Sequence, residues 1–321
     1  MTRPAHHIVN IGGGKDSTAT YLLALERGKP FRAVWADTGH EHPLTVEYIR
    51  TLAARTGGPE VEPVKADLSA QIARKREVVQ TKWRKDGVSE DTIARALAAL
   101  HPTGNPFVDL TLWKGRFPSS RAQFCTQELK VKPIGAQVLN PALAFGPVVQ
   151  WLGIRRDESR NRANTPIFRR VRWVDPRSTL IYYCPIADWG WEDVFALHER
   201  HGIKPNPLYT KGARRVGCWP CIYAGKAELR MIAQVDPDAA ARLEEWEALV
   251  AEASKRGEAT FFAPDTTPEG AAMAKRGVTG KRGGEQYPRA RQVFDWANTA
   301  RGGWQRELFQ PACVSEYGMC E

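Results

Sequence analysis

The sequence lacks long hydrophobic runs, since no apolar stretch approaches the roughly 20 residues that a membrane-spanning helix needs. The N-terminal residues also lack the apolar segment of a secretory signal. We find no internal repeat, which argues against a solenoid or a propeller. These absences lead us to expect a cytoplasmic protein with no membrane partner.

Cysteine occurs only six times, and acidic residues are outnumbered by basic ones. In a cytoplasmic chain, cysteines are more typical of metal binding or catalysis than of disulfides. The 46 Lys and Arg residues against 36 Asp and Glu residues give a net charge of +10, which favours a polyanionic ligand such as a nucleotide or a nucleic acid. Eight arginines fall within residues 155–177. A basic surface without a polyanionic partner is the alternative.

The N-terminal part of the chain alternates short apolar runs with amphipathic segments. Residues 6–11 form an apolar run that ends in glycines, and residues 16–28 have apolar side chains at helical spacing up to Gly28. The alternation continues with a strand at 31–37, a helix at 43–58 and a strand at 61–68. This spacing predicts an α/β fold with a parallel sheet and right-handed crossovers. Ligands bind at the carboxyl ends of such strands, where residues 12–17 and 37–42 would lie.

The loop "GGGKDS" at residues 12–17 combines the features of a phosphate-binding loop. Its three glycines allow a tight turn that directs backbone N–H groups to one point, and the helix N-terminus that follows adds its dipole. Lys15 adds a positive charge, while Asp16 and Ser17 can cap the helix. The loop is not a Walker A loop, because position 9 is Val9, and it is not a dinucleotide fingerprint, because Ser17 stands where the third glycine belongs. The alternative is an ordinary glycine turn before a capped helix.

This loop resembles the SGGKDS pyrophosphate loop of the PP-loop, or adenine nucleotide alpha hydrolase-like, superfamily. Four further segments resemble phosphoadenosine-phosphosulfate (PAPS) reductases, in that family's order, and "PFVDLTLWKGRFPSSRAQFCT" looks most like its phage and prophage members. The four segments are "WADTGHEHPLTVEYI" (35–49), "FCTQELKVKPI" (124–134), "WLGIRRDESRNRA" (151–163) and "CPIADWGWEDVFALHERHGIKPNPLY" (184–209). One departure is Gly12, where the family usually has serine.

The resemblance implies a doubly wound parallel sheet and an adenine nucleotide as ligand, which is PAPS, adenylyl sulfate or ATP. It implies that Lys15 and Arg155 contact phosphate or sulfate oxygens, since a guanidinium suits planar anion recognition. The nucleotide-binding residues implied are Gly12, Gly13, Gly14, Lys15, Asp16, Ser17, Asp37, Thr38, Gly39, Lys130, Arg155 and Arg162. Asp157 and Glu158 either bind Mg²⁺ or pair with these arginines, and we prefer pairing.

Residues 69–123 do not belong to the minimal fold that the family implies. They predict one or two basic helices that serve as a substrate lid, as a surface for an acidic partner, or as a plain helical insertion. We expect a nucleotide-binding domain over residues 1–210, including this insertion, and a C-terminal cysteine-containing region over residues 211–321. In that region, the Gly- and Pro-rich residues 267–288 predict a mobile loop or linker. Cys184, in the first domain, is expected to be a buried core thiol.

The pair Cys218 and Cys221 in "GCWPC" has the spacing of two ligands to one metal. It predicts either a [4Fe–4S] cluster, which the family resemblance favours, or a structural Zn²⁺. In one arrangement Cys125 joins the pair. In the other, Cys313 and Cys320 join it and Cys125 stays at the nucleotide site. A thioredoxin-like redox pair is a further alternative.

The resemblance implies an enzyme of sulfur metabolism, an oxidoreductase or a sulfurtransferase. In the reductase version a cysteine thiolate, with Cys320 as the candidate, attacks PAPS or adenylyl sulfate, and a thioredoxin-like reductant releases sulfite. Thioredoxin-dependent members end in Glu-Cys-Gly-(Leu/Ile)-His, whereas this chain reads "EYGMCE". In the sulfurtransferase version ATP adenylates a nucleic acid, which then receives sulfur, as in DNA phosphorothioation or tRNA thiolation. A non-catalytic, metal-stabilised nucleic-acid-binding protein is the second alternative.

Overall fold

The computed structural model describes residues 4–171, 178–278 and 286–300. These residues form two compact units. Within the described ranges, the first unit takes residues up to 66 and residues 126–221, and the second takes residues 67–125 and 222–300. Each unit is built from two separate stretches of the chain, which differs from the expected single boundary at residue 210.

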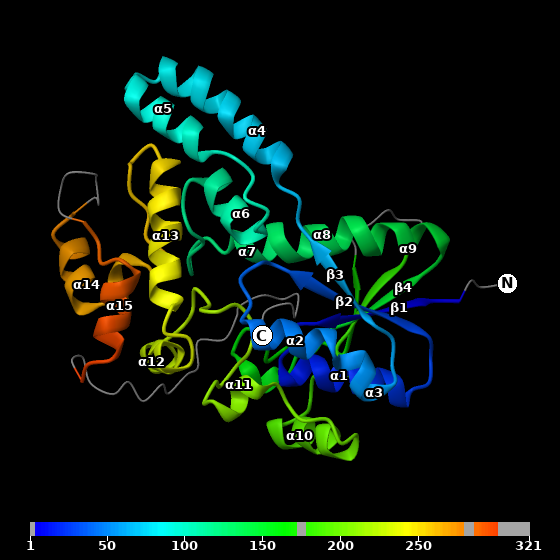
Figure 1. Ribbon diagram of the computed structural model, residues 1–321. Coiled ribbons are helices and arrows are strands. Elements are labelled where there is room, and N and C mark those ends of the chain that lie inside the picture. Colours follow the sequence, from blue (N-terminus) through cyan, green and yellow to red (C-terminus); the bar gives the residue numbers. More distant parts are fainter. Residues whose placement is uncertain (1–3, 172–177, 279–285, 301–321) are drawn as a thin grey trace. The chain divides into compact units, whose positions relative to one another are not determined.

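A sheet of six strands is the centre of the first unit (Figure 1). Its strands are β1 (His6–Ile11), β2 (Phe31–Asp37), β3 (Val61–Lys65), β4 (Val148–Trp151), β5 (Phe168–Val171) and β6 (Leu180–Tyr183). They lie in the order β3-β2-β1-β4-β6-β5, and all neighbours run parallel except β5, which runs antiparallel to β6. The predicted strands at 6–11 and 31–37 are confirmed, and the third ends at Lys65 instead of residue 68.

Helices cover both faces of this sheet. They are α1 (Lys15–Glu26), α2 (Pro43–Arg50), α3 (Leu52–Thr56), α8 (Lys132–Ile134), α9 (Asn140–Phe145), α10 (Trp191–Arg200) and α11 (Pro207–Thr210), and π-helical turns join α8 and α9 into one run with α7 (Phe124–Thr126). Successive residues of a strand face opposite sides. Accordingly, Val9 packs with Leu22 of α1 on one face, while Ile8 packs with Ile134 of α8 on the other. The doubly wound α/β fold is therefore confirmed.

The strand order reverses between β1 and β4. From β1 the chain moves outward through β2 to β3, and then returns to place β4 on the other side of β1. Ligands of doubly wound sheets bind at the carboxyl ends of the strands at such a switch point. The backbone after β4 comes very close to the start of α1, since a Cβ added at Gly153 would lie 2.9 Å from the backbone nitrogen of Ser17. The two loops that follow β1 and β4 are thereby held against each other.

The second unit is helical. Its helices are α4 (Ser69–Val78), α5 (Glu90–Ala99), α6 (Pro106–Lys114), α12 (Lys226–Val235), α13 (Ala239–Glu252), α14 (Pro268–Lys275) and α15 (Ala290–Ala297). The ring of Phe107 on α6 lies 5.6 Å from that of Trp246 on α13 and 6.1 Å from that of Phe261, centroid to centroid. The insertion thus buries its apolar side chains against the later segment, which is why the two share one unit. In the described ranges, no helix is long and apolar enough to cross a bilayer.

The expectation of a loop or linker over residues 267–288 is wrong for its first part. Pro268–Lys275 forms α14, with Thr267 as N-cap, its side chain accepting a hydrogen bond from the Gly270 N–H at 3.1 Å. Proline at the first helical position and a threonine N-cap are ordinary helix-start signals. The prediction was based on the Gly and Pro content of the whole stretch, and it missed these local signals for a short helix.

Candidate functional site

The loop between β1 and α1 contains a backbone conformation that glycine adopts easily and other residues rarely do. Gly13 has φ of 82°, and a Cβ there would lie 2.6 Å from a methyl carbon of Thr45 on α2. The N-cap of α1 is Gly14, so neither Asp16 nor Ser17 caps the helix as expected. Instead, the Ser17 hydroxyl accepts a hydrogen bond from the Gly12 N–H and donates one to the Gly14 carbonyl, both at 3.1 Å. Ser17 therefore closes the loop on itself.

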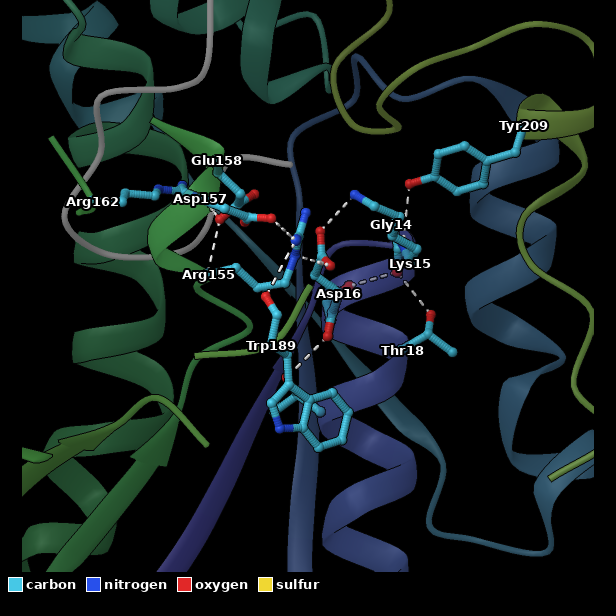
Figure 2. A network of polar contacts seen from close by, with 12 residues as sticks. Gly14, Lys15, Asp16, Thr18, Arg155, Asp157, Glu158, Arg162, Trp189 and Tyr209 are labelled. Atoms are coloured by element: carbon cyan, nitrogen blue, oxygen red, sulfur yellow. Dashed lines mark hydrogen bonds and ion pairs between the residues drawn. The ribbon is translucent and has the colours of Figure 1, made fainter. Parts of the chain in front are cut away.

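Three side chains from the segment after β6 support the same loop. The Tyr209 hydroxyl accepts a hydrogen bond from the Lys15 N–H at 3.0 Å (Figure 2). The His198 Nε2 lies 2.8 Å from the Lys15 carbonyl oxygen, and Asn206 Nδ2 donates to the Gly13 carbonyl at 3.1 Å. Burial lowers the pKa of His198, which favours a neutral ring whose Nε2 proton is donated to that carbonyl. Sequence reasoning assigned none of these roles, although the segment resembling the family ended at Tyr209.

Asp16 is the centre of a buried ion-pair cluster at the start of α1. Its carboxylate accepts from Lys15 Nζ and from Arg155 Nε, each at 2.7 Å, and Arg155 Nη1 lies 2.6 Å from Asp157 (Figure 2). The side chains of Asp16 and Arg155 are 1% and 6% exposed. Burial opposes the charge of Arg155, but the carboxylates of Asp16, Asp157 and Glu158 outweigh it and raise the guanidinium pKa. Asp16 thus holds the two cations at the start of α1.

The residues proposed for Mg²⁺ pair with arginines. Asp157 pairs with Arg155, and Glu158 pairs with Arg162, whose side chain is 3% exposed. Glu158 also accepts a hydrogen bond from the Arg155 backbone N–H at 3.0 Å. These contacts fix both arginines in the loop after β4, as the preferred interpretation expected.

The loop after β2 is built around Glu41, which sequence reasoning did not single out. Its carboxylate accepts from the Thr38 hydroxyl at 2.6 Å and from the Thr38 and His40 N–H groups at 3.2 Å each. Burial raises the pKa of Glu41, and the nearby Lys130 opposes that rise. Asp37 pairs with Lys65 of β3 at 3.0 Å. The "DTGHE" loop is therefore held together by hydrogen bonds to the Glu41 carboxylate.

The Cys-x-x-Cys segment packs against this same loop. The backbone N–H of Trp219 donates a hydrogen bond to the His40 carbonyl at 2.7 Å, and the His40 ring Nε2 lies 2.8 Å from the Pro220 carbonyl oxygen. Glu41 and Cys218 form an antiparallel bridge. Cys218 therefore lies beside the carboxyl end of β2.

A hollow opens between these loops at the carboxyl end of the sheet. It is lined by Asn10, Ile11, Gly12, Ser17, Val34, Trp35, Ala36, Glu41, Lys130, Ile134 and Gly217. Three of the expected nucleotide-binding residues meet around it: Gly12 and Ser17 from the glycine loop, and Lys130, which lies more than a hundred positions later in the sequence. Lys130 is 9% exposed. Arg162 lines a different cavity together with Arg169 and Cys184.

The described residues do not by themselves supply a metal site. Within them, no group of three or more His, Cys, Asp and Glu side chains could hold a metal ion. Cys218 and Cys221 belong to the first unit and Cys125 to the second, while Cys313 and Cys320 lie outside the described residues. A tetrahedral cluster or zinc site needs four ligands, and the ligand set stays a prediction. Cys184 is 2% exposed, and burial raises its pKa to about 11, which confirms a buried thiol.

Taken together, the sheet and its loops define an α/β protein with a glycine-rich loop and a helix N-terminus at the switch point. The family model of the phosphoadenosine phosphosulfate reductase domain matches residues 6–224. The chain belongs to this family.

Relatives of two kinds accompany this match. An uncharacterized 37.8 kDa protein of Escherichia phage 186 is 45% identical over 98% of this chain and 96% of its own length. An adenosine 5'-phosphosulfate reductase of Streptomyces coelicolor is 48% identical over 30% of this chain, and only 37% of that reductase is covered. A crystal structure of a PAPS reductase from Candida auris has a TM-score of 0.40 and 19% identity, covering 67% of this chain and 82% of that one.

Proposed function

We propose that this protein is an enzyme that binds an adenine nucleotide by its phosphates at the Gly12–Ser17 loop and reduces a sulfonucleotide, adenylyl sulfate or PAPS, or performs a related sulfur transfer. One observation carries the proposal: the glycine loop, a helix N-terminus and the Lys130 side chain line one hollow at the switch point. Such a helix N-terminus favours an anion through its backbone N–H groups and its dipole. Family membership supports the sulfonucleotide as that anion.

The arginines after β4 support anion binding at the same end of the sheet. Arg155 lies in the loop after β4, beside the start of α1. Three carboxylates fix it there, those of Asp16, Asp157 and Glu158. These contacts keep a guanidinium at the carboxyl end of the sheet, the end at which ligands of such folds bind. We assign Lys15 and Arg155 to the anionic end of the substrate, with Lys130 nearer the hollow.

The chemical step we propose is thiolate attack on the sulfate sulfur. A new S–S bond forms between the cysteine and that sulfur, the bond between the sulfur and the bridging phosphate oxygen breaks, and AMP or its 3'-phosphorylated form leaves. A dithiol reductant of the thioredoxin type then attacks the cysteine sulfur, displaces sulfite, and becomes oxidised to a disulfide. Cys320 is the proposed nucleophile. A nearby guanidinium or ammonium group would lower the pKa of such a thiol.

A second candidate is ATP-dependent adenylation and sulfur transfer to a nucleic acid. The observation that favours it is an exposed basic strand: on β5, Phe168 is 62% exposed and is followed by the exposed Arg169 and Arg170. Aromatic rings next to arginines are suited to bases and phosphates of a single strand. The two candidates differ in the nucleotide they need, which is ATP in one and a sulfonucleotide in the other.

Competition binding on anaerobically purified protein separates them. We expect adenylyl sulfate or PAPS to bind more tightly than ATP, and Lys15→Ala to weaken binding of each by at least 10-fold, since a charged hydrogen bond contributes about 1.5–3 kcal/mol. Lys132→Ala is the matched control, because Lys132 also pairs with a carboxylate at 2.7 Å but is 63% exposed. Preference for ATP would support the second candidate. If no adenine nucleotide binds, both candidates are wrong.

A further inference from the structure

Two amide side chains are buried side by side on the strands at the switch point. Asn10 of β1 is 5% exposed, and Gln150 of β4 is 0% exposed. Gln150 Nε2 donates a hydrogen bond to Asn10 Oδ1 at 3.2 Å. Among the described residues, the second polar atom of each amide, Asn10 Nδ2 and Gln150 Oε1, has no hydrogen-bond partner.

A buried polar atom without a hydrogen-bond partner is unusual, because removing it from water costs free energy that only a new hydrogen bond restores. These two amides stand in the apolar interior, since Ile8 of β1 and Val148 of β4 belong to the core cluster of that face. Hydrophobic side chains at both positions would pack without such a cost. An unsatisfied donor kept at this place therefore points to a ligand that satisfies it.

Asn10 lines the hollow at the carboxyl end of β1 and β2. The part of the wall formed by the strands and α8 is apolar, with Ile11, Val34 and Ile134, while Glu41 and Lys130 are its charged residues. The glycine loop borders the same hollow, through Gly12 and Ser17. A ligand whose phosphates lie at the loop would thus place a flat, apolar group against these walls, beside the Asn10 amide.

We propose that Asn10 recognises the base of the nucleotide, its Nδ2 donating a hydrogen bond to a ring nitrogen of adenine. The inference rests on the proposed function, and it adds a base-recognition residue that the phosphate loop does not provide. Gln150 acts as a positioning residue: its Nε2 engages Asn10 Oδ1 and thereby turns Nδ2 toward the hollow. An amide suits this role because purine ring nitrogens are hydrogen-bond acceptors.

The test uses AMP and three analogues, 1-deaza-, 3-deaza- and 7-deaza-AMP, each lacking one ring nitrogen. We expect wild-type protein to bind one of the three about 3- to 10-fold more weakly than AMP, the size of one net hydrogen bond. In Asn10→Ser that penalty disappears, because the variant binds AMP as weakly as it binds the analogue. Gln150→Met, which keeps the side-chain length but no longer orients Asn10, reduces the penalty without removing it.

Two outcomes overturn the inference. The first is equal binding of AMP and all three analogues by wild-type protein, a comparison that needs no folded variant and would mean that the amide is satisfied by water. The second is a penalty of the same size in wild-type protein and Asn10→Ser. In either case, AMP binding that is still lost in Lys15→Ala leaves the proposed function standing. Absence of AMP binding altogether overturns both.

Discussion

Replacing Arg155 by methionine tests whether the buried ion-pair cluster stabilises the first unit. The substitution leaves the Asp16 carboxylate, 1% exposed, with Lys15 as its remaining charged contact among the described residues. Breaking a buried ion pair by removing one partner costs about 3–5 kcal/mol, because the other charge stays buried without full compensation. We expect the lower end, about 3 kcal/mol, since Lys15 Nζ stays 2.7 Å from Asp16.

The neighbouring Arg156 offers a matched control. It also pairs with an aspartate, Asp188, but their side chains are 35% and 57% exposed. An exposed pair contributes only about 0–1 kcal/mol, and the hydrogen bond from Arg156 Nε to the Thr165 carbonyl adds about 1 kcal/mol, so Arg156→Met should lower stability by no more than about 2 kcal/mol. The two variants remove the same chemical group at adjacent positions and differ in burial.

Urea unfolding followed by far-UV circular dichroism measures the difference. With a slope of about 2–3 kcal/mol per molar urea, a loss of 3 kcal/mol lowers the midpoint by about 1 M or more. Because a protein of this size has a net stability of only about 5–15 kcal/mol, the loss should be easily seen. Equal midpoints for Arg155→Met and Arg156→Met would refute the reasoning. The double variant Asp16→Leu/Arg155→Met should recover part of the loss, since it removes both charges.

Four further substitutions give distinct outcomes. Gly13→Ala should lower the free energy of unfolding by at least about 1 kcal/mol because of its φ of 82°, whereas Gly12→Ser, whose added Cβ meets no atom closer than 3.8 Å, should not. Equal losses in urea unfolding would contradict this. Tyr209→Phe removes the acceptor of the Lys15 N–H and should cost about 1 kcal/mol in the same assay; an unchanged midpoint would exclude that contribution. In the second unit, burial raises the pKa of Glu258, whose two oxygens have no hydrogen-bond partner among the described residues. The stability that its protonated form provides is present below its ordinary value of 4.5 and is lost as pH rises through the folded-state pKa. Glu258→Gln should therefore raise the melting temperature at pH 7 but not at pH 4, and a gain independent of pH would contradict the assignment.

The sheet and the glycine loop could be predicted because their signals are local. A run of apolar residues that ends in glycines is enough to predict β1, and helical spacing up to Gly28 is enough to predict α1. Hydrogen bonds and side-chain direction repeat every two residues in a strand and every 3.6 in a helix, so the pattern is contained in a short segment. The later strands β4, β5 and β6 were not predicted, and the antiparallel direction of β5 depends on its pairing with β6.

The division into two units could not be predicted from the same kind of pattern. The sequence of residues 69–123 predicts one or two basic helices, but not which segment covers their apolar side chains. Phe107 finds its partners at Trp246 and Phe261, more than a hundred residues later. Which apolar faces pack together depends on how the whole chain folds. Apolar contacts are not directional, so a segment's own sequence does not specify its packing partner.

The sequence by itself determined the strand-helix alternation, the loop at residues 12–17 and the family. Only the tertiary structure showed that Tyr209, 194 positions away, bonds the Lys15 N–H, and that Asn10 and Gln150 share a buried contact across 140 positions. It also showed that Asp16 holds Arg155 and does not cap its own helix. The physical reason is that a local conformation follows from neighbouring residues, whereas a buried polar group takes whichever partner the folded chain brings within about 3 Å.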